Sequence, residues 1–421
     1  MDFNLDAGYA QYLDQQDELA EFRNRFVIDD PDLIYLDGNS LGRLPKVTRE
    51  RLQHAIDHEW GHQLIRNWNQ GWMALNERVG DKIGQLIGAS PGEVTIADST
   101  SVNLFKLAHA ALTAKPNRNK IVTDDLNFPS DHYILQGLSK MMDRPIEIHV
   151  ATSPDGIHGP VDELESLIDE NTALVTLSHT VFKTSYTYDM AAITAMAERV
   201  GALTLWDISH SVGSTHVELN RSNAPLAVGC TYKHLNGGPG APAFLYVRKD
   251  LQQQLVNPIS GWMGHQDVFK FDLRYDADPG IRQFMTGTPF ILSITAIEPA
   301  IDMFIEAGMD RIRQKAMKQS EYFISLWREW LAPFGFKLNA PEDVKWRGSH
   351  LSLGHEDGLR IDQALIHDMK VIPDFRPPDN IRFGFTPLYT TFEEVYEGAK
   401  RLREVMTEKL FEKYTEAPLV T

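Results

Sequence analysis

The sequence predicts an α/β protein with a large domain, built on a mostly parallel sheet covered by helices, and a smaller α+β domain. Two observations predict this fold class. Between about residues 120 and 247, short apolar runs alternate with helical patterns, as expected where helices connect parallel strands and cover the sheet. After about residue 290, a long helical pattern is followed by short strand-like pieces and two more helices. This change of pattern indicates a second domain.

The expected strands of the large domain are β-rich runs about as long as buried strands. They are KIVTDD (120–125), IEIHVAT (146–152), TALVTLSHT (172–180), LTLWDIS (203–209) and APAFLYV (241–247). A helix is expected over 189–202, where Met190, Ile193, Met196 and Val200 recur on one face. In the second domain, strands are expected at 336–340 and 349–354, and helices at 358–369 and 391–411.

Three segments are expected along the 421 residues. Residues 1–70 form an N-terminal segment that packs with the small domain. Residues 71–290 form the large α/β domain, and residues 291–421 form the small α+β domain.

The charge and composition exclude several classes of function. The chain has 41 basic and 58 acidic residues, a net charge of −17, so it would repel a nucleic-acid backbone or an anionic membrane surface. No run reaches the ~18 apolar residues that span a bilayer, and the acidic N-terminus does not resemble a signal peptide. The single cysteine, Cys230, excludes an intrachain disulfide and cysteine-based metal cages. We therefore expect a cytoplasmic protein that binds neither nucleic acid nor membrane.

Two polar positions stand where a site should form in this fold class, at the carboxyl ends of the strands. Asp207 ends the run LTLWD, with His210 three residues beyond it. Lys233 lies between an apolar segment and a Gly/Pro-rich turn. Taken singly, Asp207 is equally a turn or cap residue and Lys233 an exposed loop lysine.

Together these residues suit pyridoxal phosphate (PLP). A lysine in an apolar surrounding can form a Schiff base, because desolvation favours its neutral amine. A strand-end carboxylate can keep the pyridine nitrogen protonated. The run DSTS at 98–101 precedes a helical pattern and offers hydroxyls and free N–H groups to a phosphate, although it is also an ordinary helix cap. A second helix start supplies Phe128 and Asp131.

Seven motifs give the chain a resemblance to the kynureninases, within the fold-type I, aminotransferase class V group of PLP enzymes. They are YLDGNSLGRLP from Tyr35, STSVNL from Ser99, FPSD from Phe128, DISHSVG from Asp207, TYKHLNGGPGAP from Thr231, the pair Gly261-Trp262, and NIRFGFTPLY from Asn380. Any one motif is weak evidence, whereas all seven in this order are specific, and they extend over nearly the whole chain.

The resemblance implies a role for each matching position. Lys233 would be the Schiff-base lysine, Asp207 the partner of the pyridine nitrogen with Asp131 close by, and Phe128 the stacking ring. The other cofactor contacts implied are Thr100, Ser101, Ser178, His210, Tyr232, Trp262 and Thr288, with Trp262 and Thr288 reaching the phosphate across a dimer interface. Arg382 would pair with the substrate α-carboxylate, and Ser40, His62 and Trp68 would be further substrate contacts. Ser101 stands where many relatives have Thr, and Thr288 where some have Asn; both keep a hydrogen-bonding side chain.

The implied reaction is hydrolysis of L-kynurenine to anthranilate and L-alanine, in tryptophan catabolism and NAD biosynthesis, by a homodimer with sites at the subunit interface. The preference between kynurenine and its 3-hydroxy analogue stays open, and Tyr232 is the candidate proton shuttle. Another class V enzyme, an aminotransferase or a cysteine desulfurase-like lyase, is the alternative. A desulfurase needs a cysteine on a mobile loop, whereas Cys230 lies in an apolar run.

A zinc-peptidase signature also occurs, at His58-Glu59-Trp60-Gly61-His62. Gly61 weakens the helix that such a site needs, and no usual third-ligand motif follows. His54, His58 and His62 form one stripe, which is typical of a solvated or interface helix face. We expect no metal.

Overall fold

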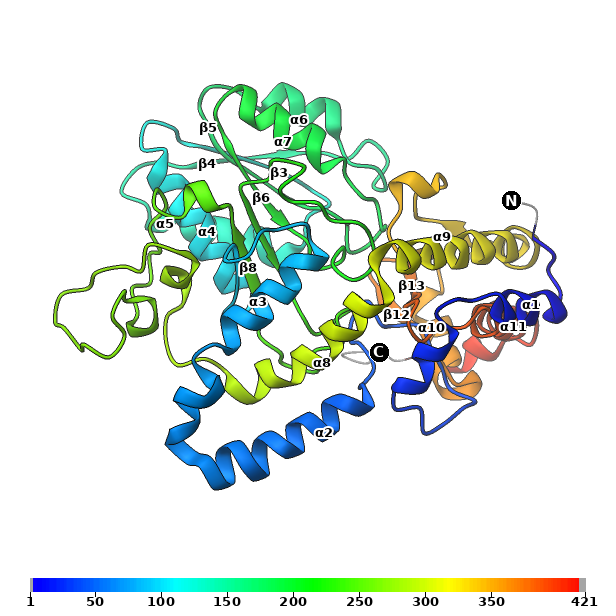
Figure 1. Cartoon of the computed structure of the whole chain (residues 1–421). Helices are drawn as coiled ribbons and strands as arrows, with labels where there is room; N and C mark the ends of the chain where they lie inside the picture. The colour runs from blue at the N-terminus through cyan, green and yellow to red at the C-terminus, as the bar shows by residue number, and fades with distance from the viewer. Residues whose placement is uncertain (1–2, 416–421) are drawn as a thin grey trace.

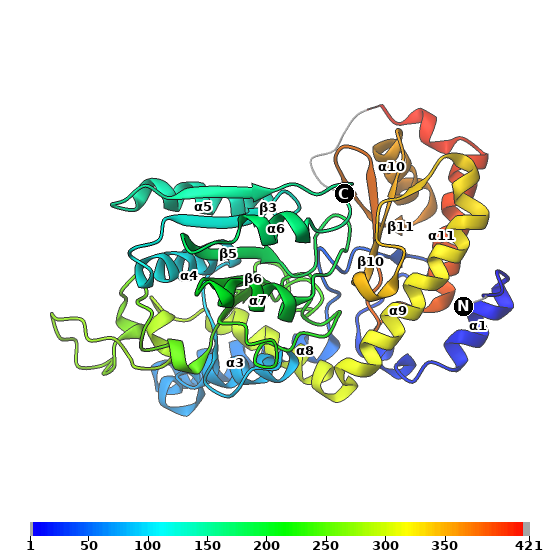
Figure 2. The same ribbon diagram turned by 90° about the horizontal axis from the view of Figure 1, so that it is seen from above.

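A seven-stranded sheet forms the centre of the larger of two lobes in the computed structural model, which describes residues 3–415 (Figure 2). The strands are β2 (Val94–Ile96), β3 (Lys120–Asp124), β4 (Glu147–Ala151), β5 (Thr172–Ser178), β6 (Leu203–Asp207), β7 (Leu226–Gly229) and β8 (Phe244–Val247). Their order is β2-β8-β7-β6-β5-β3-β4. β8 runs in the opposite direction to the other six strands of this sheet, so the predicted mostly parallel sheet is confirmed. The short strands β2 and β7 were not predicted.

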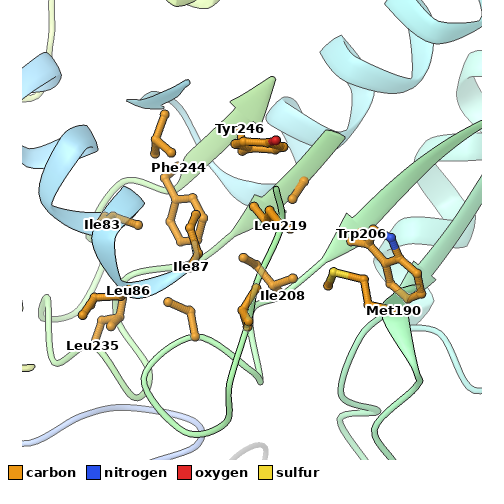
Figure 3. Packing of buried hydrophobic residues seen from close by; sticks show 14 of the residues in the cluster. Ile83, Leu86, Ile87, Met190, Trp206, Ile208, Leu219, Leu235, Phe244 and Tyr246 are labelled. Atoms are coloured by element: carbon orange, nitrogen blue, oxygen red, sulfur yellow. The ribbon is translucent and has the colours of Figure 1, made fainter. Parts of the chain in front are cut away.

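Both faces of this sheet are covered because its strands are apolar on both sides. Along β6, Leu205 packs with helices α4 (Thr100–Ala114) and α5 (Pro129–Met141), whereas Trp206 faces the opposite core. Figure 3 shows that opposite core, in which Ile83 from α3 (Leu75–Leu86) and Met190 from α7 (Met190–Arg199) lie among strand side chains. Helix α6 (Val161–Leu167) covers the same face through Leu164.

Two helices that follow strands begin with side-chain caps. Ser99 accepts a hydrogen bond from the N–H of Val102 at the start of α4, and Asp189 accepts one from Ala192 at the start of α7. Such caps satisfy N–H groups that have no partner within the helix. The cap at Ser99 fixes the start of α4 at the edge of the sheet where the predicted site lies.

The small lobe contains a four-stranded antiparallel sheet with helices packed against it (Figure 1). Its strands, in the order β12-β13-β10-β9, are β12 (Asp374–Arg376), β13 (Asn380–Gly384), β10 (His350–Gly354) and β9 (Lys337–Leu338). Its helices are α9 (Met309–Leu326), α10 (Gly358–Met369) and α11 (Phe392–Thr407). Thr391 and Glu394 form a capping box at the start of α11. The predicted α+β character is confirmed.

The N-terminal segment contacts both lobes. Helix α1 (Ala7–Gln15) places Ala10 and Leu13 in the core of the small lobe, and β1 (Ile34–Tyr35) pairs with β11 (Val371–Ile372). Phe22 and Phe26 belong to the core of the large lobe, and α2 (Lys46–His54) packs on α8 (Ile291–Ala307). The buried face of α8 joins the large core as well. The domain division at residues 70 and 290 stays a prediction.

The long connection between β8 and α8 projects from the large lobe, away from the small one (Figure 1). It carries the exposed rings Phe269 and Phe271. Among residues 3–415, no helix is long and apolar enough to cross a membrane.

Candidate active site

A pocket of about 150 Å³ opens at the carboxyl ends of β5 and β6. Ser178 ends β5 and Asp207 ends β6, and the two residues are register partners. The pocket brings together nine of the predicted site residues, namely Thr100, Ser101, Phe128, Asp131, Ser178, Asp207, His210, Tyr232 and Lys233. They come from segments more than 130 residues apart, which meet because parallel strands end at the same edge of the sheet.

Asp207 and Asp131 form a buried pair of carboxylates in the pocket. Burial raises the pKa of Asp207, against a hydrogen bond from Ser209, whose backbone N–H lies 2.8 Å from Oδ1 of Asp207. Burial also raises the pKa of Asp131 well above its ordinary value, and the nearby charge of Asp207 raises it further. Oδ2 of Asp131 has no hydrogen-bond partner among the described residues. Two buried acids with an unsatisfied oxygen suit a cationic N–H donor.

Lys233 lies in the loop after β7 and lines the same pocket. Its Nζ is 2.7 Å from Nε2 of His210 and 5.9 Å from the centroid of the Phe128 ring. Burial lowers the pKa of His210 well below its ordinary value, and the charges of Lys233 and Arg382 lower it further. The imidazole of His210 is therefore neutral at physiological pH, and the amine of Lys233 has a neutral partner.

The start of α4 forms a polar cradle at another wall of the pocket. Thr100 and Ser101 are its first residues, and the hydroxyl of Ser101 lies 2.9 Å from that of Ser130 at the start of α5. Asp98 precedes them with a left-handed backbone, φ +43°, and its carboxylate is 2.7 Å from the fully buried amine of Lys106. Two helix N-termini with hydroxyls thus point to one place, an arrangement that suits an anion.

Phe128 supplies the aromatic wall. It precedes Pro129, the first residue of α5, and its ring is partly exposed. The ring meets that of Phe182 edge to face, with centroids 5.1 Å apart. Phe128 therefore packs against Phe182 and also lines the pocket, where a ligand ring could contact it.

Tyr232 is fixed by the glycine-rich turn of the N-terminal segment. The N–H of Gly42 donates to the carbonyl of Tyr232 at 2.9 Å. A Cβ at Gly42 would lie 2.4 Å from the carbonyl oxygen of Lys233, so only glycine permits this approach. Nearby charge on Cys230, then burial, raise the pKa of the Tyr232 phenol. Tyr232 is accordingly a protonated hydrogen-bond donor near neutral pH.

Arg382 and Ser40 lie together in a cluster next to the pocket. Nε of Arg382 donates to Oδ1 of Asp374 at 2.7 Å, and Nη2 pairs with Oδ2 of the same carboxylate. Nη1 donates to the carbonyl of Phe182 at 2.6 Å, and Nη2 donates to the hydroxyl of Ser40 at 2.8 Å. Arg382 is only 1% exposed. The guanidinium predicted to bind a substrate carboxylate thus already has a carboxylate partner within the chain.

With this geometry established, the comparisons with known proteins identify the family. The sequence model of aminotransferase class V matches residues 34–330, and that of the kynureninase C-terminal domain matches residues 312–402. The chain is 43% identical over 402 residues to the kynureninase of Pseudomonas fluorescens, covering 94% of both chains. It is 42% identical to the kynureninase of Burkholderia pseudomallei (strain K96243), with the same coverage. The chain belongs to the kynureninase family.

Solved structures of class V type share the fold. The apo structure of a cysteine desulfurase from Thermococcus onnurineus NA1 matches with a TM-score of 0.79 and 18% identity, covering 92% of this chain and 98% of that one. A variant of C-DES with glycine covalently linked to its PLP cofactor matches with a TM-score of 0.77 and 18% identity, covering 89% and 97%. At this identity, the likeness confirms the predicted fold class.

Besides Arg382 and Ser40, four more residues that resemble kynureninase site positions lie outside the pocket. Trp262 is partly exposed on the projecting connection, where it stacks near Phe271. Thr288 lines a separate cavity of about 90 Å³, which Asp98 also lines. His62 is exposed, and Trp68 packs edge to face on Trp72. A single chain does not bring these four to Lys233.

In the HExxH segment, the glutamate is bound by neighbouring side chains of the chain itself. It lies in the π-helical stretch Ala55–Gln63 that continues α2. Glu59 accepts a hydrogen bond from the Trp72 indole at 2.9 Å and pairs with Arg51 at 2.6 Å. Within residues 3–415, no group of three His, Cys, Asp or Glu side chains could hold a metal ion.

Several residues in the pocket or beside it were not predicted from the sequence. Thr180 and Ser209 line the pocket two residues beyond the ends of β5 and β6, so the strand-end rule that found Asp207 could also have found them. Asn127 orders two predicted residues, because its Oδ1 accepts from the hydroxyl of Ser178 at 2.5 Å and from the N–H of Phe128 at 3.0 Å. No sequence pattern indicated Asp374 as a site residue, because its contact with Arg382 depends on how two strands pair.

Proposed function

We propose that the protein is a PLP-dependent kynureninase that hydrolyses the Cβ–Cγ bond of L-kynurenine to anthranilate and L-alanine, with 3-hydroxykynurenine as a second candidate substrate. The observation that carries the proposal is the pocket holding Lys233 and Asp207 beside the guanidinium of Arg382. The kynureninase relatives, at 42–43% identity over nearly the whole chain, support the choice of substrate.

The residues present fit PLP. The unpartnered oxygen of Asp131 and the buried carboxylate of Asp207 suit a pyridine N–H. The cradle at Thr100 and Ser101 suits a phosphate dianion, and Phe128 offers a ring face. Lys233 is the amine that would bond the cofactor carbonyl carbon. An acid pair, an aromatic face, an amine and an anion cradle in one pocket match the four parts of this cofactor.

Bound there, PLP would draw electron density away from the Cα and Cβ atoms of the substrate. The protein groups would then position atoms and move protons. Lys233 would remove the proton from Cα of the substrate, and Asp207 would hold a proton on the ring nitrogen of the cofactor. Tyr232 would relay a proton through its phenol oxygen. A water molecule adds to the γ-carbonyl carbon of kynurenine, so that cleavage leaves anthranilate as the acid and alanine as the amino acid.

The desulfurase alternative has a structural argument against it. Cys230 is 2% exposed, and burial raises the pKa of its thiol. A persulfide-forming cysteine must be ionised and reach the substrate, whereas Cys230 lies under the loop that carries Lys233.

The direct test is anthranilate fluorescence during incubation of the PLP-loaded protein with L-kynurenine, with loss of 3-hydroxykynurenine absorbance followed in parallel. Release of anthranilate and alanine in equal amounts is the expected result. A yellow protein that binds PLP through Lys233 and forms no product from either substrate would overturn the proposal and favour another class V reaction.

We also infer a homodimer with sites at the subunit interface. An apolar groove of about 530 Å³ is lined by Trp60, Leu64, Ile65, Trp72, Phe290, Ile291, Leu292 and Ser293. Ile65 is 76% exposed and Phe290 is 53% exposed, and exposed apolar surface of this kind marks an interaction site. The groove adjoins Thr288 in the sequence and includes the segment between His62 and Trp68, so a second copy seated here would bring these residues to an interface.

We also propose a cellular compartment and a metabolic pathway for the protein. A cytoplasmic location is supported by the single, unpaired and buried Cys230, which is compatible with a reducing compartment. The proposed reaction would belong to tryptophan catabolism and would supply NAD biosynthesis when the 3-hydroxy substrate is used.

A further inference from the structure

Asp374 holds one edge of Arg382 through a two-point ion pair. The two residues are directly opposite each other on the antiparallel strands β12 and β13. Oδ1 of Asp374 accepts from Nε of Arg382 at 2.7 Å, and Oδ2 accepts from Nη2. Both side chains are buried. A fork-to-fork pair of this kind fixes the plane of the guanidinium as well as its position.

The opposite edge of the guanidinium has fewer partners. Nη1 donates to the carbonyl of Phe182 at 2.6 Å, and within residues 3–415 its second N–H meets no acceptor. The ring of Phe182 packs on Phe128, which lines the pocket. The less occupied side of Arg382 therefore contacts the residue that packs on the aromatic wall of the pocket.

Ser40 forms hydrogen bonds with both Asp374 and Arg382 on the Nε–Nη2 edge of the guanidinium. Its hydroxyl donates to Oδ2 of Asp374 at 2.8 Å and accepts from Nη2 of Arg382, also at 2.8 Å. Arg376 pairs with the same Oδ2 at 2.6 Å. Without the Asp374 carboxylate, the guanidinium groups of Arg376 and Arg382 would lose the anion that pairs with both of them, a costly change in a buried site.

The charged groups around Arg382 have a net positive charge near pH 7 and can therefore accept one more anion. Burial and the charge of Asp374 raise the pKa of Asp37 to about 8 and that of Asp362 to about 7. Burial acts in the same direction on Asp374, but Arg382 and Arg376 outweigh it and lower its pKa. Near pH 7, one firmly ionised carboxylate therefore stands beside two guanidinium cations, and an incoming carboxylate meets a net positive site.

We propose that Asp374 is a positioning residue for the substrate α-carboxylate: it holds the Nε–Nη2 edge of Arg382 and thereby presents the Nη1 side to the substrate. This inference rests on the proposed function, in which Arg382 binds the carboxylate of an amino-acid substrate. Asp374 itself does not touch the substrate. A competing arrangement, in which the substrate carboxylate displaces Asp374 from Arg382, makes the opposite prediction for binding.

The test is the preference of the PLP-loaded protein for an amine that carries a carboxylate. Dissociation constants for L-alanine and ethylamine, which differ only in the carboxylate, are read from changes in cofactor absorbance. In Asp374→Asn, the preference for L-alanine should fall by ~10- to 100-fold, as expected for the loss of a charged hydrogen-bonded contact, with ethylamine binding unchanged. An unchanged preference overturns the inference, and a stronger preference shows that Asp374 competes with the ligand.

Two further variants separate positioning from folding. Asp368→Asn removes a carboxylate of the same lobe that pairs with Lys413 and not with the Arg382 cluster, and it should leave the preference unchanged. If Asp374→Asn does not fold, Ser40→Ala tests the same hold on Arg382 and should lower the preference by a smaller factor; no change would contradict the inference. Absence of anthranilate from the wild type would refute the proposed function only, because the alanine-to-ethylamine ratio does not depend on turnover.

Discussion

The amine of Lys233 lies 2.7 Å from Nε2 of His210. His210 is buried at the end of β6, and its pKa is held far below neutrality by burial and by the charges of Lys233 and Arg382. A neutral imidazole can accept a hydrogen bond from the Lys233 amine. This hydrogen bond does not prevent the amine from forming a covalent bond with a cofactor. The contact therefore fixes the position of the Nζ atom in the pocket that also contains Asp131 and Asp207.

Lys233→Ala should abolish turnover and the absorbance of the lysine-bound cofactor, because no other amine lines the pocket among the described residues. The assay is anthranilate fluorescence together with the absorbance spectrum of the PLP-loaded protein. Lys183→Ala, a lysine outside the pocket, is the matched control and should keep both signals. Turnover by Lys233→Ala without added amine would show that a group other than Lys233 binds the cofactor and removes the substrate proton.

Tyr232→Phe should lower kcat while the cofactor stays bound. Charge on Cys230 and burial raise the pKa of the phenol, so its hydroxyl is a donor near pH 7, and removal of a positioned proton donor costs on the order of 10²- to 10⁴-fold in rate. The measurement combines kcat with the PLP dissociation constant. If the cofactor is lost while kcat at saturating PLP is unchanged, Tyr232 is mainly a phosphate ligand.

The sequence predicted the pocket better than the substrate side of the site, and the reason is topological. Asp207 and Ser178 end parallel strands, so a rule about strand ends places them together. The pairing of Arg382 with Asp374 depends on the register of a short hairpin-like pair of strands in the small lobe. Neither the alternation of residues nor a motif specifies that register, because β12 has only three residues.

Two strands of the large sheet were not predicted, again because their positions depend on strand pairing. Strands β2 and β7 are too short for a period-two pattern, and their place in the sheet comes from pairing with β8, which runs against its neighbours. Trp262, from the Gly261-Trp262 motif, and Thr288, a position implied by the resemblance, do not line the pocket of their own chain. Their predicted role depends on a second subunit, which a single sequence does not position.

The stability of the protein should fall as the pH rises from about 4 to about 7, in part because of Asp362. In the unfolded chain this carboxyl ionises near 3.8, whereas burial and the charge of Asp374 raise its pKa in the fold to about 7. The folded state thus binds more protons over this range, and raising the pH favours unfolding. Asp362→Asn should gain stability relative to the wild type as the pH rises, by on the order of a few kcal/mol at pH 8.

Melting temperatures of the two proteins between pH 4 and pH 8 check this prediction. The curves should meet near pH 4 and separate with increasing pH. Asp37, whose pKa is raised to about 8, keeps part of the slope in the variant. Parallel curves would show that Asp362 does not hold its proton in the folded state.

Hybrid dimers should reveal whether Trp262 serves the site of the other subunit. In one chain, Trp262 lies on the projecting connection and does not line the pocket that contains Lys233. Lys233→Ala should be inactive, and Trp262→Ala should lose at least ~10-fold in activity at limiting PLP through a weakened phosphate contact. If Trp262 acts across the interface, a hybrid of the two variants contains one intact site.

Co-expression of the two variants with random pairing should recover about a quarter of the wild-type activity, because half of the dimers are hybrids and each has one of its two sites intact. Lys233→Ala paired with Tyr232→Phe is the control, since both residues line one pocket in the same chain and no hybrid site escapes both changes. Recovery in the first pairing and none in the second places Trp262 in the partner's site. Equal failure of both pairings assigns Trp262 to its own chain or to folding, and a monomer in sedimentation would exclude the shared site altogether.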